Sequence, residues 1–203
     1  ADEALLESYN DERLEAAQEN VKVTRRTARF LRPADGIERA FRQATISLAR
    51  QYPFARSLIN TGRMAVANTY RGSRVCGDNG GTSVQNVKIQ WRPGKTGALN
   101  DLLQWADGRL LILVFGAQSK ASLKRLQELS ASGLPVRCVQ VLAKGDVAQA
   151  REHLWDAQGH LQRACAAVPA GGWAVIRPDG YLADTGKGVN GELVGAVATS
   201  LGL

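Results

Sequence analysis

Near the start of the chain, one set of mostly apolar residues recurs every three or four positions, which is the period of one helical face. Pro33 disfavours helical geometry in the residue before it, so we predict a first helix that ends there. A second helix is predicted over residues 36–52, and a third, short helix runs from Pro53 to a left-handed exit at Gly62. The residues that define the first helical face are Leu6, Tyr9, Arg13, Ala17 and Val21.

From residue 84 onward the pattern changes to alternating strands and helices. Residues 110–115 are continuously apolar, as in a strand covered on both faces, and Pro178-Asp179-Gly180 indicates a hairpin turn. A parallel βαβ unit over residues 110–142 and a final antiparallel pair predict an α/β fold of the thioredoxin-like type, a central mixed sheet flanked by helices. The expected strands are 87–91, 110–115, 136–142, 173–177 and 181–183, and the expected helices are 99–103, 119–132, 146–155 and 193–201.

The stretch between these two regions is rich in glycine. Residues 71–83 hold four glycines and show no apolar periodicity, which is typical of a loop or linker. We therefore predict three parts: a helical segment over residues 1–70, a linker over residues 71–83, and a thioredoxin-like domain over residues 84–203.

Composition and net charge limit the kinds of partner that this chain could bind. With 44% hydrophobic and 22% charged residues the chain is ordinary globular material, and no apolar run is long enough for a membrane span. The net charge of +7 is uneven, because residues 1–20 hold seven acids and one base while residues 21–76 hold twelve bases and two acids. Acids and bases share the first helix, so we favour an arginine-lined protein interface over a nucleic-acid partner, although a basic patch does supply affinity for phosphates.

Few side chains are suited to catalysis. A thioredoxin would carry its reactive cysteine just after the first buried strand, but residues 116–120 read Gly-Ala-Gln-Ser-Lys. Cys138 and Cys165 are expected in the core, and an odd total of three cysteines favours reduced thiols and a cytoplasmic location. His153 and His160 have only Glu152 and Asp156 nearby in sequence, a pair we interpret as an exposed acidic helix face. We predict no catalytic, cofactor-binding or metal-binding residue in this chain.

A phosphate-binding loop is the alternative meaning of Gly77-Asp78-Asn79-Gly80-Gly81. A dinucleotide site needs Gly-x-Gly-x-x-Gly between a strand and a helix. This run instead follows a helical region and precedes a strand, so a flexible linker is the better interpretation.

Residues 5–13, 53–63 and 177–180 resemble, in this order, three stretches of the FAD-dependent aromatic-ring hydroxylases, the group that includes the phenol, pentachlorophenol and 3-(3-hydroxyphenyl)propionate hydroxylases. Residues 5–13, Leu-Leu-Glu-Ser-Tyr-Asn-Asp-Glu-Arg, look like a helix that closely follows the flavin-contacting Gly-Asp motif of that family. Residues 53–63 are similar to the stretch that leaves its catalytic core, and Arg-Pro-Asp-Gly at 177–180 resembles the hairpin of its thioredoxin-like C-terminal domain. The resemblance implies a C-terminal fragment, an excised or processed piece, of such an enzyme.

The family's FAD-binding motifs are absent from this sequence, because they all precede the helix that resembles residues 5–13. The resemblance therefore implies no cofactor in this fragment, with FAD and NAD(P)H used by the full-length parent. Its expected partners are its own upstream FAD domain and further copies of itself, since helices built to pack on another domain leave apolar stripes exposed. The alternative is a stand-alone binding module with a basic helical arm that binds a protein or a nucleic acid.

Overall fold

The computed structural model describes residues 3–59, 66–92, 95–166, 168–169 and 171–203. They form two compact units. The helical unit is Tyr9–Asn68, and the sheet unit combines Ala1–Ser8 with Thr69–Leu203. The chain therefore begins in the sheet unit, leaves it after Ser8 and returns to it at Thr69.

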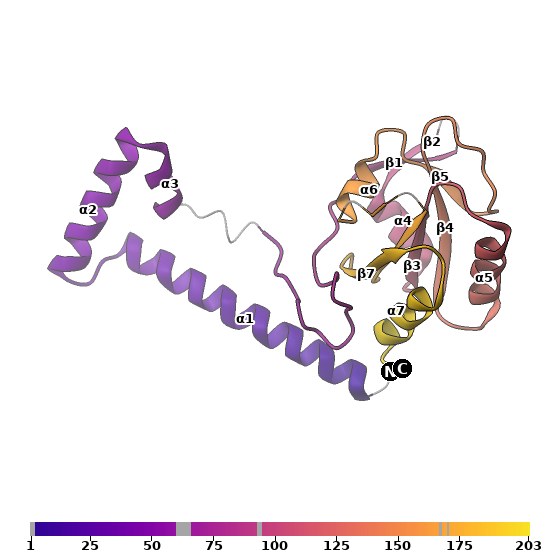
Figure 1. The fold of residues 1–203 in the computed structure, drawn as a ribbon. Coiled ribbons are helices and arrows are strands. Elements are labelled where there is room, and N and C mark those ends of the chain that lie inside the picture. The colour runs from indigo at the N-terminus through magenta and orange to yellow at the C-terminus, as the bar shows by residue number, and fades with distance from the viewer. Residues whose placement is uncertain (1–2, 60–65, 93–94, 167, 170) are drawn as a thin grey trace. The chain divides into compact units, whose positions relative to one another are not determined.

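Three helices form in the first part of the chain, as the periodicity predicts (Figure 1). They are α1 (Glu3–Leu31), α2 (Gly36–Gln51) and α3 (Pro53–Ile59). A capping box starts α2, because Asp35 Oδ1 accepts from the backbone N–H of Glu38 at 2.7 Å while Glu38 Oε2 accepts from the N–H of Ala34 at 2.8 Å. The predicted exit at Gly62 lies outside the described residues.

The sheet unit is built on seven strands in the order β2-β1-β5-β4-β3-β6-β7. The pairs β3·β4 and β4·β5 are parallel, and the remaining pairs are antiparallel. Its strands are β1 (Lys88–Arg92), β2 (Lys95–Ala98), β3 (Leu110–Phe115), β4 (Val136–Leu142), β5 (His153–Trp155), β6 (Gly172–Ile176) and β7 (Leu182–Lys187). Its further helices are α4 (Leu99–Ala106), α5 (Lys120–Ala131), α6 (His160–Ala164) and α7 (Gly191–Leu201).

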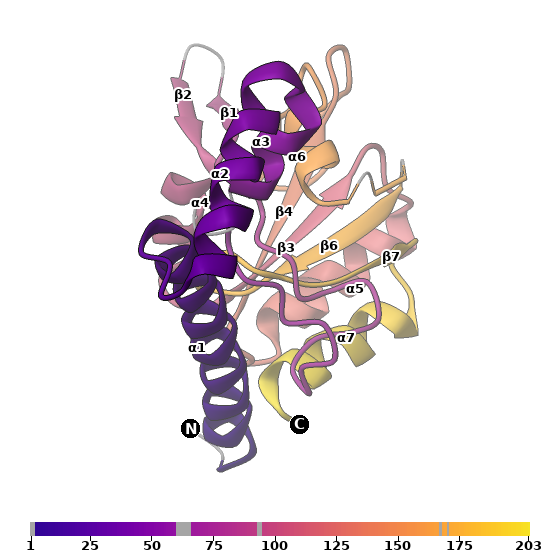
Figure 2. The ribbon, with the colours of Figure 1, turned by 90° about the vertical axis from the view of Figure 1, so that its left-hand side faces the viewer.

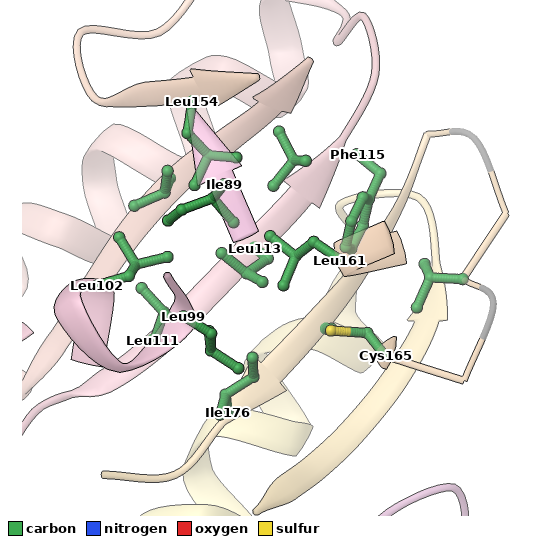
Figure 3. Close-up of a cluster of buried hydrophobic side chains, with 14 of the residues drawn as sticks. Ile89, Leu99, Leu102, Leu111, Leu113, Phe115, Leu154, Leu161, Cys165 and Ile176 are labelled. Carbon is green, nitrogen blue, oxygen red and sulfur yellow. The ribbon is translucent and has the colours of Figure 1, made fainter. Parts of the chain in front are cut away.

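Helices cover both faces of this sheet, which gives the unit two hydrophobic cores. Leu99 and Leu102 of α4 and Leu161 of α6 pack on one face, and Figure 3 shows that core. On the other face α5 contributes Leu126 and α7 contributes Leu193, and Figure 2 shows these two helices together on that side. All six residues of β3 are buried, because both of its faces are covered. The prediction of an α/β, thioredoxin-like fold is confirmed.

The predicted helix over residues 146–155 is wrong. Residues 153–155 form β5, which pairs in parallel with β4. The reason is a tertiary interaction: Gln140 Oε1 of β4 accepts from the backbone N–H groups of Gln149 and Ala150, both at 2.9 Å. Asp146, the first residue of the predicted helix, accepts from the N–H of Ala143 behind it, at 2.8 Å, and caps no helix. Strand β2, which no sequence pattern indicated, completes the sheet beside β1.

Residues 71–83 are not a spacer between units, because the compact sheet unit already begins at Thr69. The backbone N–H groups of Gly77 and Gly81 donate to the carbonyls of Ala183 and Leu182 in β7, both at 2.8 Å. A Cβ on Gly77 would collide with the Asp184 carboxylate, and one on Gly80 or Gly81 would collide with a neighbouring backbone. The glycines thus permit close packing against β7. Composition alone does not distinguish a segment packed in this way from a flexible one.

Candidate functional site

The corner after β3, where a thioredoxin would carry its cysteine, is occupied by a glutamine. Gln118 is buried, and its Nε2 donates to the carbonyl of Phe115 at 3.1 Å. Its own backbone N–H donates to the side-chain oxygen of Gln149 at 2.7 Å. Ser119 caps α5 directly afterwards by accepting from the N–H of Ser122 at 3.0 Å. The corner is therefore held by amide hydrogen bonds.

Gln140 is the centre of this arrangement, which we call the glutamine cluster (Gln118, Gln140 and Gln149). Gln140 is almost fully buried in β4, and its Nε2 donates to the carbonyl of Gly116 at 3.0 Å and to Gln149 Oε1 at 3.2 Å. Side-chain amides are neither nucleophiles nor titratable groups, so the cluster supports structure and not catalysis. Sequence reasoning missed it. The available signal was a single amide in an otherwise largely apolar buried strand.

The cysteines lie away from that corner. Burial raises the pKa of the Cys165 thiol to about 12, with a further contribution from the negative charge of Asp156. Burial also raises the pKa of Cys138 in β4, although a hydrogen bond with Ser130 acts in the opposite direction. A raised pKa leaves less thiolate, the reactive form. Cys165 is a buried core residue, whereas Cys138 is partly buried and packs against the other core. Cys165 follows α6 as its C-terminal cap, and does not lie inside a helix.

His153 and His160 do not form a catalytic pair. His153 lies in β5, where its Nδ1 is 3.0 Å from the carbonyl oxygen of Ala150 and its ring meets that of Trp155 edge-on. Asp156 does not share a helix face with Glu152. It is buried, and it caps α6 by accepting from the N–H groups of His160 at 2.8 Å and Gln162 at 2.9 Å. Over the described part of the chain, no group of three or more His, Cys, Asp or Glu residues could hold a metal ion.

The Arg-Pro-Asp-Gly stretch forms the turn between β6 and β7. Gly180 adopts a φ of +82° and its N–H donates to the carbonyl of Arg177 at 3.0 Å. Arg177 Nη2 donates to Asp179 Oδ2 at 2.8 Å, and its Nη1 lies 3.7 Å from the sulfur of Cys76. Tyr181 stacks on Tyr70 with ring centroids 4.6 Å apart. The turn therefore anchors the segment that re-enters the sheet unit, which is a structural role.

A cavity of about 540 Å³ lies beside β7. Asp78, Asn79 and Glu192 contribute polar groups to it, together with residues of β7. The glycine-rich segment beside it does not offer a phosphate-binding loop, because the N–H groups of Gly77 and Gly81 are already bonded to β7. The carboxylates of Asp78, Asp184 and Glu192, which line the cavity, would also repel a phosphate. This cavity therefore does not fit the phosphate groups of a flavin or nucleotide.

The remaining feature is an exposed apolar face on α2, which we take as the candidate interface. Ile37, Phe41, Leu48 and Tyr52 lie on one side of the helix at successive spacings of four, seven and four residues, and all four are exposed. Ile37 is 82% exposed and Phe41 63% exposed. The sequence correctly identified this side as apolar, and the structure shows that nothing in the described chain covers it. Scattered exposed apolar residues are ordinary, but a continuous helical face of them indicates a protein contact.

In the described residues, no helix combines the length and the apolar character needed to cross a membrane.

Comparison with known proteins gives similarity in structure but not in sequence. No protein-family model matches the chain, and no curated protein is significantly similar to it. Aklavinone-11 hydroxylase, solved in a ternary complex with FAD and aklavinone, covers 100% of this chain with a TM-score of 0.61 and 21% identity. The flavin-dependent monooxygenase PieE, solved with FAD and substrate, also covers 100%, with a TM-score of 0.65 and 16% identity.

This chain spans only 36% and 40% of the length of those two proteins. Thioredoxin-like proteins also match, over a smaller share of the chain and with lower TM-scores. The exposed lipoprotein thioredoxin Etrx1 of Streptococcus pneumoniae covers 56% of this chain with a TM-score of 0.41 and 18% identity, and 98% of its own length is matched. The chain therefore has the fold of one part of an FAD-dependent monooxygenase.

Proposed function

We propose that this chain is the C-terminal part of an FAD-dependent monooxygenase that hydroxylates aromatic rings with NAD(P)H, and that it is non-catalytic by itself. One observation carries the proposal: the match to each of two flavin-dependent oxygenases extends over the helical unit and the sheet unit together. The motif order at residues 5–13, 53–63 and 177–180 supports the same assignment.

In this proposal the helical unit attaches the chain to its own upstream FAD domain. The exposed face of α2 supplies the contact, since a helix with an apolar face stabilises a fold mainly through packing of that face. The sheet unit then serves as a structural domain that covers the substrate side and supports association of subunits. The glutamine cluster, in the place of a redox cysteine, fits such a role. Three cysteines without disulfides fit a cytoplasmic location.

The coding sequence upstream of Ala1 provides the direct test. We expect a glycine-rich βαβ start and a Gly-Asp motif there. The complete protein should purify with bound FAD and oxidise NAD(P)H faster when a phenolic compound is added, whereas residues 1–203 alone should bind no flavin. An upstream sequence without these motifs, or NAD(P)H oxidation by residues 1–203 alone, would overturn the proposal.

The docking face can be tested in the complete protein with a matched pair of variants. Phe41→Glu places a charge in the centre of the apolar face of α2 and should lower flavin retention and thermal stability. Gln43→Glu adds the same charge on the opposite, exposed side of α2 and should change neither. Equal behaviour of the two variants would contradict docking through this face.

A further inference from the structure

The cavity beside β7 lies within the sheet unit, and its charge is opposite to that of the whole chain. Its wall is made by the glycine-rich segment, by β6 and β7, and by the start of α7. Asp78, Asp184 and Glu192 contribute three carboxylates and Lys187 contributes one ammonium group, which gives the lining a net charge of −2 in a chain whose net charge is +7. A recess of this sign attracts cations.

The three carboxylates are open to a ligand. Asp184 Oδ1 accepts from the backbone N–H of Thr185 at 2.8 Å, which fixes the direction of that carboxylate. Glu192 binds Asn190 through its backbone N–H, at 3.0 Å, and not through its carboxylate. Over the part of the chain that the structure describes, none of the three carboxylates forms an ion pair. A cation that enters the cavity therefore has no internal ion pair to break.

The arrangement of these carboxylates favours an organic cation over a metal ion. Among the described residues, no three His, Cys, Asp or Glu side chains form a group that could hold a metal ion. Carboxylates that line one cavity without converging on a point can instead accept hydrogen bonds from separate donors of a larger molecule. The volume of about 540 Å³ lies within the range of roughly 300–1,000 Å³ that is usual for small-molecule sites.

The indole ring of Trp173 in β6 gives a second, independent indication of a ligand. Trp173 is only 1% exposed, and its Nε1 is buried without a hydrogen-bond partner among the described residues. Nε1 lies against Gly186 of β7, since a Cβ on that glycine would be 3.0 Å from it. Trp173 and Gly186 both line the cavity, so the ring edge that carries the N–H is turned towards it. A buried N–H without an acceptor is unfavourable, and an acceptor within the cavity would remove that cost.

These two features require opposite hydrogen-bonding groups in the same molecule. The carboxylates bind positively charged donors, whereas the indole N–H donates only and needs an acceptor. A polyhydroxylated amine carries both, because its ammonium group donates to the carboxylates and a hydroxyl oxygen accepts from Nε1 of Trp173. A simple diamine lacks the acceptor, and a neutral sugar lacks the charge.

We propose that the cavity beside β7 binds a polyhydroxylated amine of the amino-sugar class. Asp78, Asp184 and Glu192 hold its ammonium group, and Trp173 Nε1 donates to one of its hydroxyl oxygens. Gly186 is required at its position because any side chain there would collide with the indole ring. This site goes beyond the proposed function and does not depend on the flavoprotein assignment.

The tryptophan side-chain N–H signals in NMR spectra of residues 1–203 test the site. Trp173→Phe identifies the Trp173 signal by its loss. Addition of glucosamine should move this signal in a saturable way, because an oxygen then accepts from Nε1. Glucose, which has no amine, and N-acetylglucosamine, whose nitrogen is uncharged, should leave the signal in place at equal concentrations.

A matched pair of double variants tests the carboxylates without altering the core. Asp78→Asn with Glu192→Gln removes two charges from the cavity and should raise the Kd for glucosamine about tenfold. Asp107→Asn with Glu152→Gln removes the same two charges from residues that do not line the cavity, and should leave the Kd unchanged.

Three outcomes would overturn the proposal: a Trp173 signal that glucosamine does not move, an equal response to N-acetylglucosamine, or equal Kd values for the two double variants. The measurements need no flavin. Their failure would therefore leave the upstream motifs, which test the flavoprotein assignment, unaffected.

Discussion

Similar apolar patterns lead to opposite results in the two compact units: the large apolar side chains are buried in the sheet unit and exposed in the helical unit. In the sheet unit the whole of β3 is buried between two helical layers. In the helical unit the buried hydrophobic residues are alanines (Ala16, Ala49 and Ala55), while the large apolar side chains of α2 face outward. The sheet unit completes its own core, whereas the helical unit leaves the large apolar side chains of α2 exposed. Periodicity alone thus identifies a packing face without identifying what packs on it.

The largest expected effect lies in the core of the sheet unit. Leu113→Ala removes a fully buried side chain from the centre of β3 and should lower the free energy of unfolding by about 2–5 kcal/mol. Urea denaturation followed by tryptophan fluorescence measures this loss. If Leu113→Ala lowered the free energy of unfolding by no more than a surface substitution does, Leu113 would not lie in the core.

A substitution in the glutamine cluster should have the next largest effect. Gln140→Leu leaves the N–H groups of Gln149 and Ala150 without their acceptor, at a cost of about 1–3 kcal/mol in the same unfolding experiment. Gln127→Leu, on the exposed side of α5, is the matched control and should be nearly neutral. Equal costs for the two variants would contradict the role assigned to Gln140.

The buried thiol of Cys165 makes stability depend on pH. Its pKa is raised from 9.0 to about 12, so above pH 9 the unfolded thiol ionises while the folded one keeps its proton. The folded state therefore loses stability as pH rises through this window. Between pH 8 and pH 10 the free energy of unfolding should fall by about 1.4 kcal/mol more than in Cys165→Ala. Parallel pH profiles for the two proteins would show that the thiol is not buried in this way.

The smallest expected effect tests the helical unit. Phe41→Ala removes a large aromatic ring, but the ring is exposed in this chain, so the unfolding free energy should change by less than about 0.5 kcal/mol. A loss as large as that of Leu113→Ala would mean that Phe41 is part of a core, and the contrast between the two units would fail.

Local patterns predicted the fold wherever burial of a continuous element decides the conformation. The bounds of β3 and β4 and the hairpin at 177–180 follow from apolar runs and turn residues. Prediction failed at residues 146–155, because Asp146 resembles a helix cap and the deciding contact comes from Gln140. It also failed at residues 71–83, because a glycine-rich segment has the same composition whether it forms a flexible loop or packs tightly against a strand.

The candidate site shows the same limit. The absence of a cysteine after β3 is visible in the sequence, but the amides that hold that corner come from three separate segments. Likewise the apolar side of α2 was predictable, whereas its exposure depends on the whole structure. Neither the hydrogen-bond partners of Gln140 nor the exposure of Phe41 can be derived from the residues next to them in the chain.

The path of the chain also determines the order in which the protein can assemble. Residues before Tyr9 belong to a unit otherwise made of Thr69–Leu203, and Gly202 lies against Leu5, where an added Cβ would be 3.9 Å from the Leu5 Cβ. Since synthesis proceeds from the N-terminus and domains fold as units, the first turn of α1 must wait until residues 69–203 have been made before it meets its neighbours. Helix α7 thus completes a place that was begun almost two hundred residues earlier in the same chain.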